Sequence, residues 1–120
     1  MKILVVDDEA AIRSLVRVTV EFEQPGAIVL EARDGEEGID IARREQPDLV
    51  ILDCVMPGLC GADAAPLIRE AAPGARVVLF SALDELRLNE MAERAGAPIY
   101  TKTDVTEMIE ELLAEGRVAG

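Results

Sequence analysis

The sequence lacks histidine entirely, and among its 120 residues it has only two cysteines. Without histidine the chain has no Ser-His or Cys-His nucleophile, no histidine-ligated zinc site and no phosphohistidine of its own. The cysteines, Cys54 and Cys60, lie in one short stretch, and we expect reduced thiols rather than a disulfide. Several common kinds of catalytic site are therefore excluded.

Long apolar runs are also missing, since no segment approaches the roughly 20 residues needed to cross a bilayer. The apolar start, Met1–Val6, meets acidic residues at once and is too short for a signal peptide. Hydrophobic residues nevertheless make up 50% of the chain, which argues against disorder. We therefore expect a single soluble domain in the cytoplasm.

Positive charge is scarce as well, because 12 basic residues face 24 acidic ones and the net charge is -12. A charge of this sign repels phosphate backbones and anionic lipid, so direct binding to nucleic acid or membrane is not expected. It favours cations, and basic or apolar protein surfaces. Acidic surfaces are common in soluble proteins, so the charge alone names no partner.

Short apolar segments alternate with segments of helical spacing along the whole chain. Strands are predicted at residues 3–6, 27–32, 48–52, 76–80 and 98–101, and helices near 9–23, 34–42, 62–71, 84–95 and 103–116. This alternation predicts an α/β domain with a parallel sheet covered on both faces. We expect the domain at residues 1–115, with 116–120 as a tail or the start of a linker.

Polar side chains follow four of the expected strands. In chain order they are Asp7, Asp8 and Glu9, then Asp53, then Ser81, then Thr101 and Lys102. Ligands of parallel α/β sheets bind at the carboxyl ends of the strands, so we expect these groups to converge on one edge. A single strand-end aspartate is usually a helix cap or a solvated turn, whereas the whole set indicates a functional site.

The chemistry of this set is that of a magnesium and phosphate site. Clustered carboxylates repel one another unless a cation neutralises them, and oxygen ligands without histidine or thiolate suit Mg²⁺, with Mn²⁺ as the alternative. A carboxylate can attack phosphorus to form an acyl phosphate. Lys102 and the Ser81 hydroxyl can contact phosphoryl oxygens, and metal and lysine offset charge on the transferring group.

Four motifs occur in order at the expected strand ends: VDDE at 6–9, LDCVMPG at 52–58, FSA at 80–82, and Lys102. Together they resemble the receiver domain of bacterial two-component response regulators, and the resemblance covers essentially the whole chain. It implies a flavodoxin-like three-layer α/β/α sandwich with five helices and a five-stranded parallel sheet in the order 2-1-3-4-5.

The resemblance also implies a role for each matching residue. Asp53 would be the phosphoacceptor, and Mg²⁺ would be held by Asp7, Asp8, Asp53 and the backbone carbonyl of Val55. Ser81 would turn toward the phosphoryl group, which Lys102 would also contact. The donor would be a phosphohistidine on a histidine kinase or histidine phosphotransfer protein.

The implied output is a phosphorylation-dependent change in a protein-binding face. That face would be built by the fourth helix, the last strand and the last helix. It would bind a downstream effector or an output domain, with the chain a monomer or a weak homodimer through the same face.

The chain departs from the family pattern near Lys102. Ile99 occupies the place of the usual switch aromatic and Tyr100 follows it, so either Tyr100 acts in a shifted register or it belongs to the core. Thr103 replaces a usual cis proline, and a trans peptide is expected because a cis bond without proline costs ~3 kcal/mol. Cys60 replaces a usual loop aspartate and is expected to be partly buried. Cys54 is expected to be an apolar filler.

The same residues bear on three other functions. An aspartyl-phosphate phosphatase has a second aspartate two places after the nucleophile, where this chain has Val55. A receiver-like interaction module without phosphorylation stays open because of Ile99 and Thr103. Nucleotide binding is not expected, because the chain has no glycine-rich phosphate-binding loop after the first strand. Val55 and Leu83 occupy the places that flank the path of attacking water, and neither apolar side chain can orient that water. We therefore expect that the chain is not an enzyme and dephosphorylates itself slowly at most.

Overall fold

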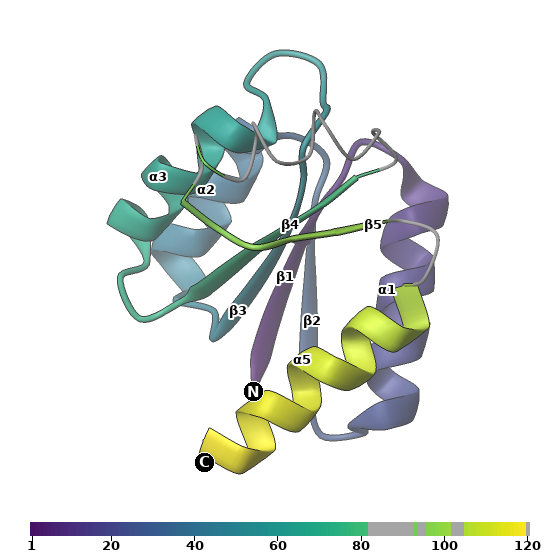
Figure 1. The fold of residues 1–120 in the computed structure, drawn as a ribbon. Helices are drawn as coiled ribbons and strands as arrows, with labels where there is room; N and C mark the ends of the chain where they lie inside the picture. The colour runs from purple at the N-terminus through teal and green to yellow at the C-terminus, as the bar shows by residue number, and fades with distance from the viewer. Residues whose placement is uncertain (82–92, 94–95, 102–104, 120) are drawn as a thin grey trace.

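The computed structural model describes residues 1–81, 93, 96–101 and 105–119. Its centre is a five-stranded parallel sheet in the order β2-β1-β3-β4-β5, which confirms the expected topology (Figure 1). The strands are β1 (Lys2–Val6), β2 (Ile28–Ala32), β3 (Leu49–Asp53), β4 (Arg76–Ser81) and β5 (Ile99–Thr101).

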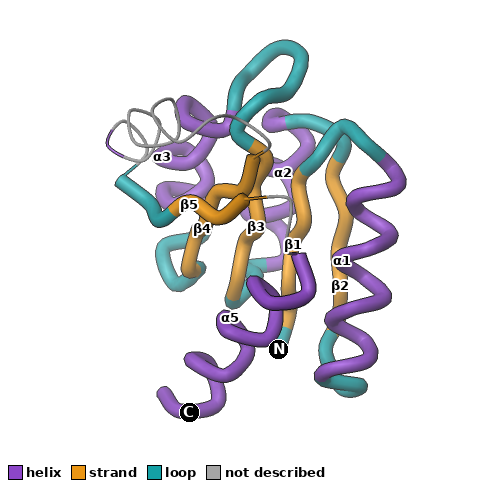
Figure 2. Tube along the Cα trace, turned by 45° about the vertical axis from the view of Figure 1, so that its right-hand side comes forward, coloured by secondary structure: helices purple, strands orange, loops and turns teal. Residues whose placement is uncertain are grey.

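Helices cover both faces of the sheet and complete a three-layer sandwich. The described helices are α1 (Ala10–Glu23), α2 (Gly35–Glu45), α3 (Gly61–Ala71) and α5 (Val105–Ala119). Helices α2 and α3 lie on one face, and α1 and α5 lie on the other (Figures 1 and 2). The helix expected at 84–95 falls outside the described residues except at residue 93.

The predicted end of the last helix at Gly116 is wrong, because α5 continues to Ala119. A glycine inside a helix costs only about 1 kcal/mol relative to alanine, so it weakens a helix without ending it. The assignment of residues 1–115 as the domain stays a prediction.

The central strands β1 and β3 are buried on both faces, as expected for parallel strands. Alternate side chains enter different cores because successive residues of a strand point to opposite faces. Leu4 and Leu52 join the cluster under α2 and α3, whereas Val5 and Ile51 join the cluster under α1 and α5. The strand ends are thus held rigidly by two apolar layers.

Helix α2 is delimited by specific hydrogen bonds at both ends. Asp34 caps its start, as expected, and its side chain accepts from the Glu37 N–H at 2.8 Å. Gln46 ends the helix in the left-handed region, with φ of 47°. Its side-chain amide donates to the Ala71 carbonyl at 2.9 Å, which joins the carboxyl ends of α2 and α3.

The start of α3 lies directly against the end of β3. The Gly61 N–H donates to the Cys54 carbonyl at 3.1 Å. A Cβ atom at residue 61 would overlap the Asp53 carbonyl oxygen and come within 2.9 Å of the Cys54 Cα. Glycine is therefore required here by the close approach of two backbones, one of which carries Asp53.

We expect Gly61→Ala to lower the free energy of unfolding by about 2–3 kcal/mol, because the backbones must separate to admit the methyl group. Urea denaturation measures this. Gly74→Ala is the matched control, since a Cβ there meets nothing within 4 Å, and its effect should stay within about 0.5 kcal/mol. Equal stability of the two variants would contradict the close approach at Gly61.

Candidate functional site

Three carboxylates meet where β1 and β3 end. Val6 pairs with Leu52, so Asp7 and Asp53 leave the sheet side by side, and Asp8 follows in the next turn. Oxygens of Asp7, Asp8 and Asp53 all lie within 4.8 Å of one another. We call these three residues the acidic group.

Two members of the acidic group are withdrawn from water. Asp7 is 0% exposed and Asp53 is 2% exposed, whereas Asp8 is open to solvent. Negative charges so close and so buried repel one another strongly unless a cation lies between them. A set of carboxylate oxygens without nitrogen or sulfur fits a hard divalent cation such as Mg²⁺.

Each buried carboxylate is oriented by the turn that follows it. Asp7 Oδ1 accepts a hydrogen bond from the Glu9 N–H at 2.8 Å, and Asp53 Oδ1 accepts one from the Val55 N–H at 3.1 Å. Aspartate favours such local turns because its short side chain reaches the backbone two residues on. The carboxylates are therefore held in place by their own loops.

Ser81 lies at the same edge of the sheet, at the end of β4. Asp53 pairs with Phe80, and the Cys54 N–H donates to the Phe80 carbonyl at 3.1 Å, so Ser81 is one residue beyond the partner of Asp53. Ser81 is 2% exposed. Lys102, expected beside it, falls outside the described residues, as do Leu83 and Thr103.

Ile99 and Tyr100 point to opposite faces of the sheet. Ile99 packs on the cluster under α2 and α3, and Tyr100 packs, half-buried, on the cluster that includes α5. Tyr100 pairs with Phe80, the neighbour of Ser81. Of the two residues, only Tyr100 therefore contacts the α5 side.

The two cysteines are thiols without a disulfide, as expected. Cys54 is buried in the apolar cluster under α2 and α3. Cys60, half-buried before α3, donates from its Sγ to Asp63 Oδ2 at 3.1 Å. Both side chains thus serve packing and local hydrogen bonding in the structure.

Two arginines and a glutamate form a cluster next to the acidic group, and the sequence patterns did not predict it. Arg13 Nη1 donates to the Asp7 carbonyl at 2.7 Å, and Arg13 Nε donates to Glu31 Oε1 at 3.1 Å. Arg17 Nη2 donates to Glu31 Oε2 at 2.6 Å. The spacing of the arginines, four apart on α1, was the only available signal, and it does not name their partner on β2.

The hydrogen bond from Arg17 is the largest cause that lowers the pKa of Glu31. Burial opposes this effect, while the charge of Arg17 and both interactions with Arg13 add to it. Glu31 therefore stays ionised to a lower pH than an unpaired glutamate, and it anchors both arginines.

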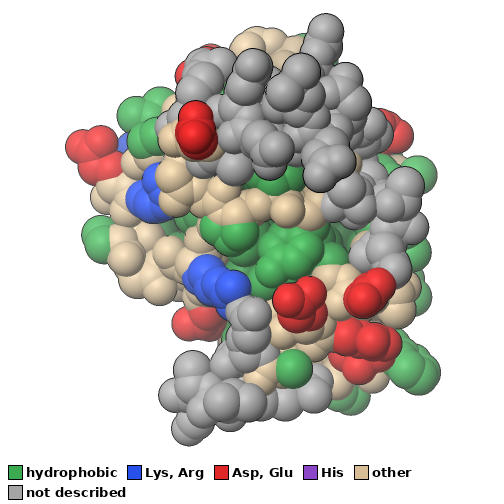
Figure 3. All heavy atoms as spheres, in the orientation of Figure 1, with side chains coloured by type: hydrophobic (Ala, Val, Ile, Leu, Met, Phe, Trp, Pro, Cys, Tyr) green, Lys and Arg blue, Asp and Glu red, His purple; other side chains and the backbone are tan. Residues whose placement is uncertain are grey.

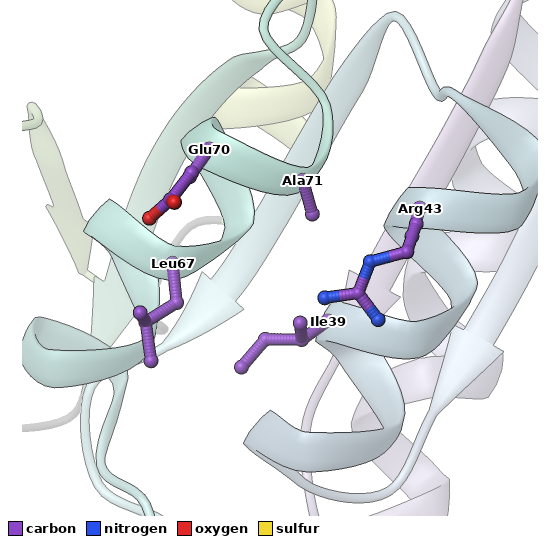
Figure 4. Close-up of a pocket in the computed structure, with 5 residues that line it drawn as sticks. All are labelled: Ile39, Arg43, Leu67, Glu70 and Ala71. Carbon is purple, nitrogen blue, oxygen red and sulfur yellow. The ribbon is translucent and has the colours of Figure 1, made fainter.

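A separate pocket of about 430 Å³ lies between α2 and α3 (Figure 4). Ile39 and Arg43 project into it from α2, and Leu67 approaches from α3. Its lining contains no member of the acidic group, so it is distinct from the candidate metal site.

Residues 3–113 match the family described as the response regulator receiver domain. The chain belongs to this family. The resemblance read from the four motifs is therefore confirmed. Among the described residues of this receiver domain, no helix is long and apolar enough to cross a membrane.

Curated relatives of the receiver domain include whole proteins of different length. This chain is 35% identical over 108 residues to protein PilH of Pseudomonas aeruginosa, and the match covers 88% of each protein. It is 33% identical over 103 residues to the nitrate/nitrite response regulator protein NarL of Escherichia coli K12, covering 86% of this chain but 48% of NarL. The chain thus spans about half of NarL.

Solved structures show the same fold. The response regulator domain of Thermotoga maritima CheB superposes with a TM-score of 0.79 at 32% identity, covering 99% of this chain and 95% of that chain. A LuxR-family two-component response regulator from Aurantimonas sp. SI85-9A1 superposes with a TM-score of 0.81 at 32% identity, covering 94% and 82%.

We expect Glu31→Gln to lower the free energy of unfolding by about 1 kcal/mol at pH 7, because two partly exposed ion pairs are lost. The folded state holds the pKa of Glu31 below its ordinary 4.5. This contribution is therefore present above pH 4.5 and disappears as the pH falls through the lower folded-state pKa.

Urea denaturation of parent and variant between pH 3 and pH 7 measures this difference. Glu70→Gln, at an exposed glutamate of α3, is the control and should show no comparable pH-dependent difference. A Glu31→Gln difference that is constant across the range would contradict the assigned role of the arginines.

Proposed function

We propose that this receiver domain is a phosphorylation-dependent switch that accepts a phosphoryl group on Asp53. The observation that carries the proposal is the acidic group, whose three carboxylates lie within 4.8 Å of one another at the carboxyl edge of the sheet. The donor is a phosphohistidine of a histidine kinase or histidine phosphotransfer protein. An Asp53 oxygen attacks phosphorus, the nitrogen–phosphorus bond breaks, and an acyl phosphate forms.

The residues around Asp53 would hold Mg²⁺, with Mn²⁺ as an alternative. The proposed ligands are Asp7, Asp8, Asp53 and the Val55 carbonyl. The cation supplies positive charge that offsets charge on the phosphoryl group. Ser81 donates its hydroxyl to a phosphoryl oxygen, and Lys102 contacts another. Asp7 and Asp53 are pre-oriented for this task by the hydrogen bonds from Glu9 and Val55.

The output surface would be the side of β5 and α5, together with the segment between β4 and β5. Tyr100 supports this placement, since its ring packs toward α5 and its strand neighbour precedes Ser81. Figure 3 shows Asp and Glu side chains gathered over α5, where Glu107, Glu110 and Glu111 are exposed. A partner surface that is basic or apolar complements this face.

The partner would be a downstream protein or an output domain, reached in the cytoplasm. An output domain is consistent with relatives about twice as long as the matched segment, as in NarL. In this proposal residues 1–115 form the receiver domain, and residues 116–120 are a tail or the start of a linker. The domain is a monomer, or a weak homodimer that pairs through the output surface. The domain itself is a phosphoacceptor rather than an enzyme.

We expect acetyl phosphate with Mg²⁺ to add one phosphoryl group to the parent chain, and the gain to be lost with EDTA or in Asp53→Asn. Intact-mass spectrometry measures this. Asp40→Asn is the matched control, because Asp40 is an exposed aspartate on α2 whose ion pair is with Arg43. It should be labelled as the parent is.

Absence of metal-dependent labelling in the parent would contradict the proposed function. It would favour the second candidate, a receiver-like interaction module without phosphorylation. The observation that favours this second candidate is Ile99, which occupies the place of the usual switch aromatic.

We expect the phosphorylated chain to lose its label slowly, and Val55→Asn to shorten the lifetime about fivefold. Val55 is 53% exposed beside Asp53 and offers no polar atom in its side chain to orient water. One hydrogen bond to water is worth ~1 kcal/mol, which corresponds to the stated factor. Loss of radiolabelled phosphate from purified protein in Mg²⁺ measures both rates. An unchanged lifetime in the variant would contradict this explanation.

A further inference from the structure

Hydrogen bonds hold both the backbone and the side chain of Asp7. Its N–H donates to the Ala32 carbonyl at 3.1 Å, and its side chain accepts from the Glu9 N–H. Its carbonyl oxygen accepts from Arg13 Nη1 at 2.7 Å. The last contact is the only one of these that comes from a side chain outside the turn. It acts on the peptide that joins Asp7 to Asp8.

Arg13 is itself fixed in place. Its side chain is 13% exposed, and its Nε donates to Glu31, which Arg17 holds from the other side. A guanidinium presents its donors in one rigid plane, so one group can contact a carbonyl and a carboxylate at the same time. Arg13 therefore connects the first turns of α1 to β2 and to the end of β1.

We propose that Arg13 is a positioning residue of the metal site. By holding the Asp7 carbonyl, it sets the peptide that carries Asp7 and Asp8, and so keeps their carboxylates within reach of Asp53. This inference rests on the proposed function, because it assigns a role toward the cation that the acidic group would hold.

Charge and position predict opposite effects of Arg13 on cation binding. A guanidinium near a site for a divalent cation repels that cation, so its charge alone weakens binding. A group that orients ligands strengthens binding, and removing such a group typically weakens metal affinity by about 10- to 100-fold. The sign of the change therefore separates the two roles.

The test compares Mg²⁺ dissociation constants by calorimetric titration of the parent, Arg13→Met, Arg13→Lys and Arg17→Met. We expect both Arg13 variants to bind Mg²⁺ about tenfold more weakly, because neither methionine nor lysine reproduces the two-directional donor. Arg17→Met is the matched control. Arg17 also binds Glu31, but it contacts Glu31 and Glu21 rather than the Asp7 carbonyl.

Two further measurements separate positioning from general loss of stability. The free energies of unfolding without Mg²⁺ should fall by similar amounts in Arg13→Met and Arg17→Met. Only Arg13→Met should bind Mg²⁺ more weakly. At saturating Mg²⁺ the rate of labelling by acetyl phosphate should return to within about twofold of the parent, a change of less than ~0.5 kcal/mol in the barrier. If Arg13→Met does not fold, Arg13→Lys supplies the same comparison.

Equal or tighter Mg²⁺ binding by the Arg13 variants would overturn the positioning role and leave the proposed function intact, since the parent would still bind Mg²⁺ and be labelled. Equal weakening in Arg17→Met would also overturn it. A parent chain that binds no Mg²⁺ and takes no label would overturn both proposals together.

Discussion

The parallel pairing of β1 with β3 is the constraint on which the rest of the structure depends. Val6 lies opposite Leu52, so the aspartates that follow them, Asp7 and Asp53, lie side by side at the same edge of the sheet. A shift of one residue would turn every side chain of the strand to the other face and exchange the two apolar cores. The register is therefore fixed by the burial of both faces, and the acidic group follows from it.

Bringing three carboxylates together at this edge opposes folding, because like charges repel and two of the three groups are buried. The structure offsets part of this cost with directed donors: the Glu9 and Val55 N–H groups on the carboxylates, and Arg13 on the carbonyl of Asp7. These donors are held by α1, β2 and the loop before α3, so the elements that flank the sheet also shape its edge. A site that gains a divalent cation would relieve the remaining repulsion.

Pattern reasoning succeeded wherever local chemistry and burial agree. Continuous apolar runs predicted the buried strands, and Asp34 predicted the start of α2, because these signals act over a few residues. The prediction that the last helix ends at Gly116 is wrong, because one glycine costs a helix only about 1 kcal/mol and does not end it. The sequence did not reveal which of Ile99 and Tyr100 packs toward α5, since that depends on how the helices cover the two faces of β5.

The sequence by itself determined the order of the elements, the family, and the identity of the acidic residues at the strand ends, because local patterns and short motifs along the chain encode all three. Only the tertiary structure decided which groups meet. The contact of Arg13 with the Asp7 carbonyl and the close approach of Gly61 to the Asp53 carbonyl both involve backbone atoms. Because backbone carbonyls are the same in every residue, a pattern of side chains does not predict which carbonyl a distant residue will approach in the folded chain.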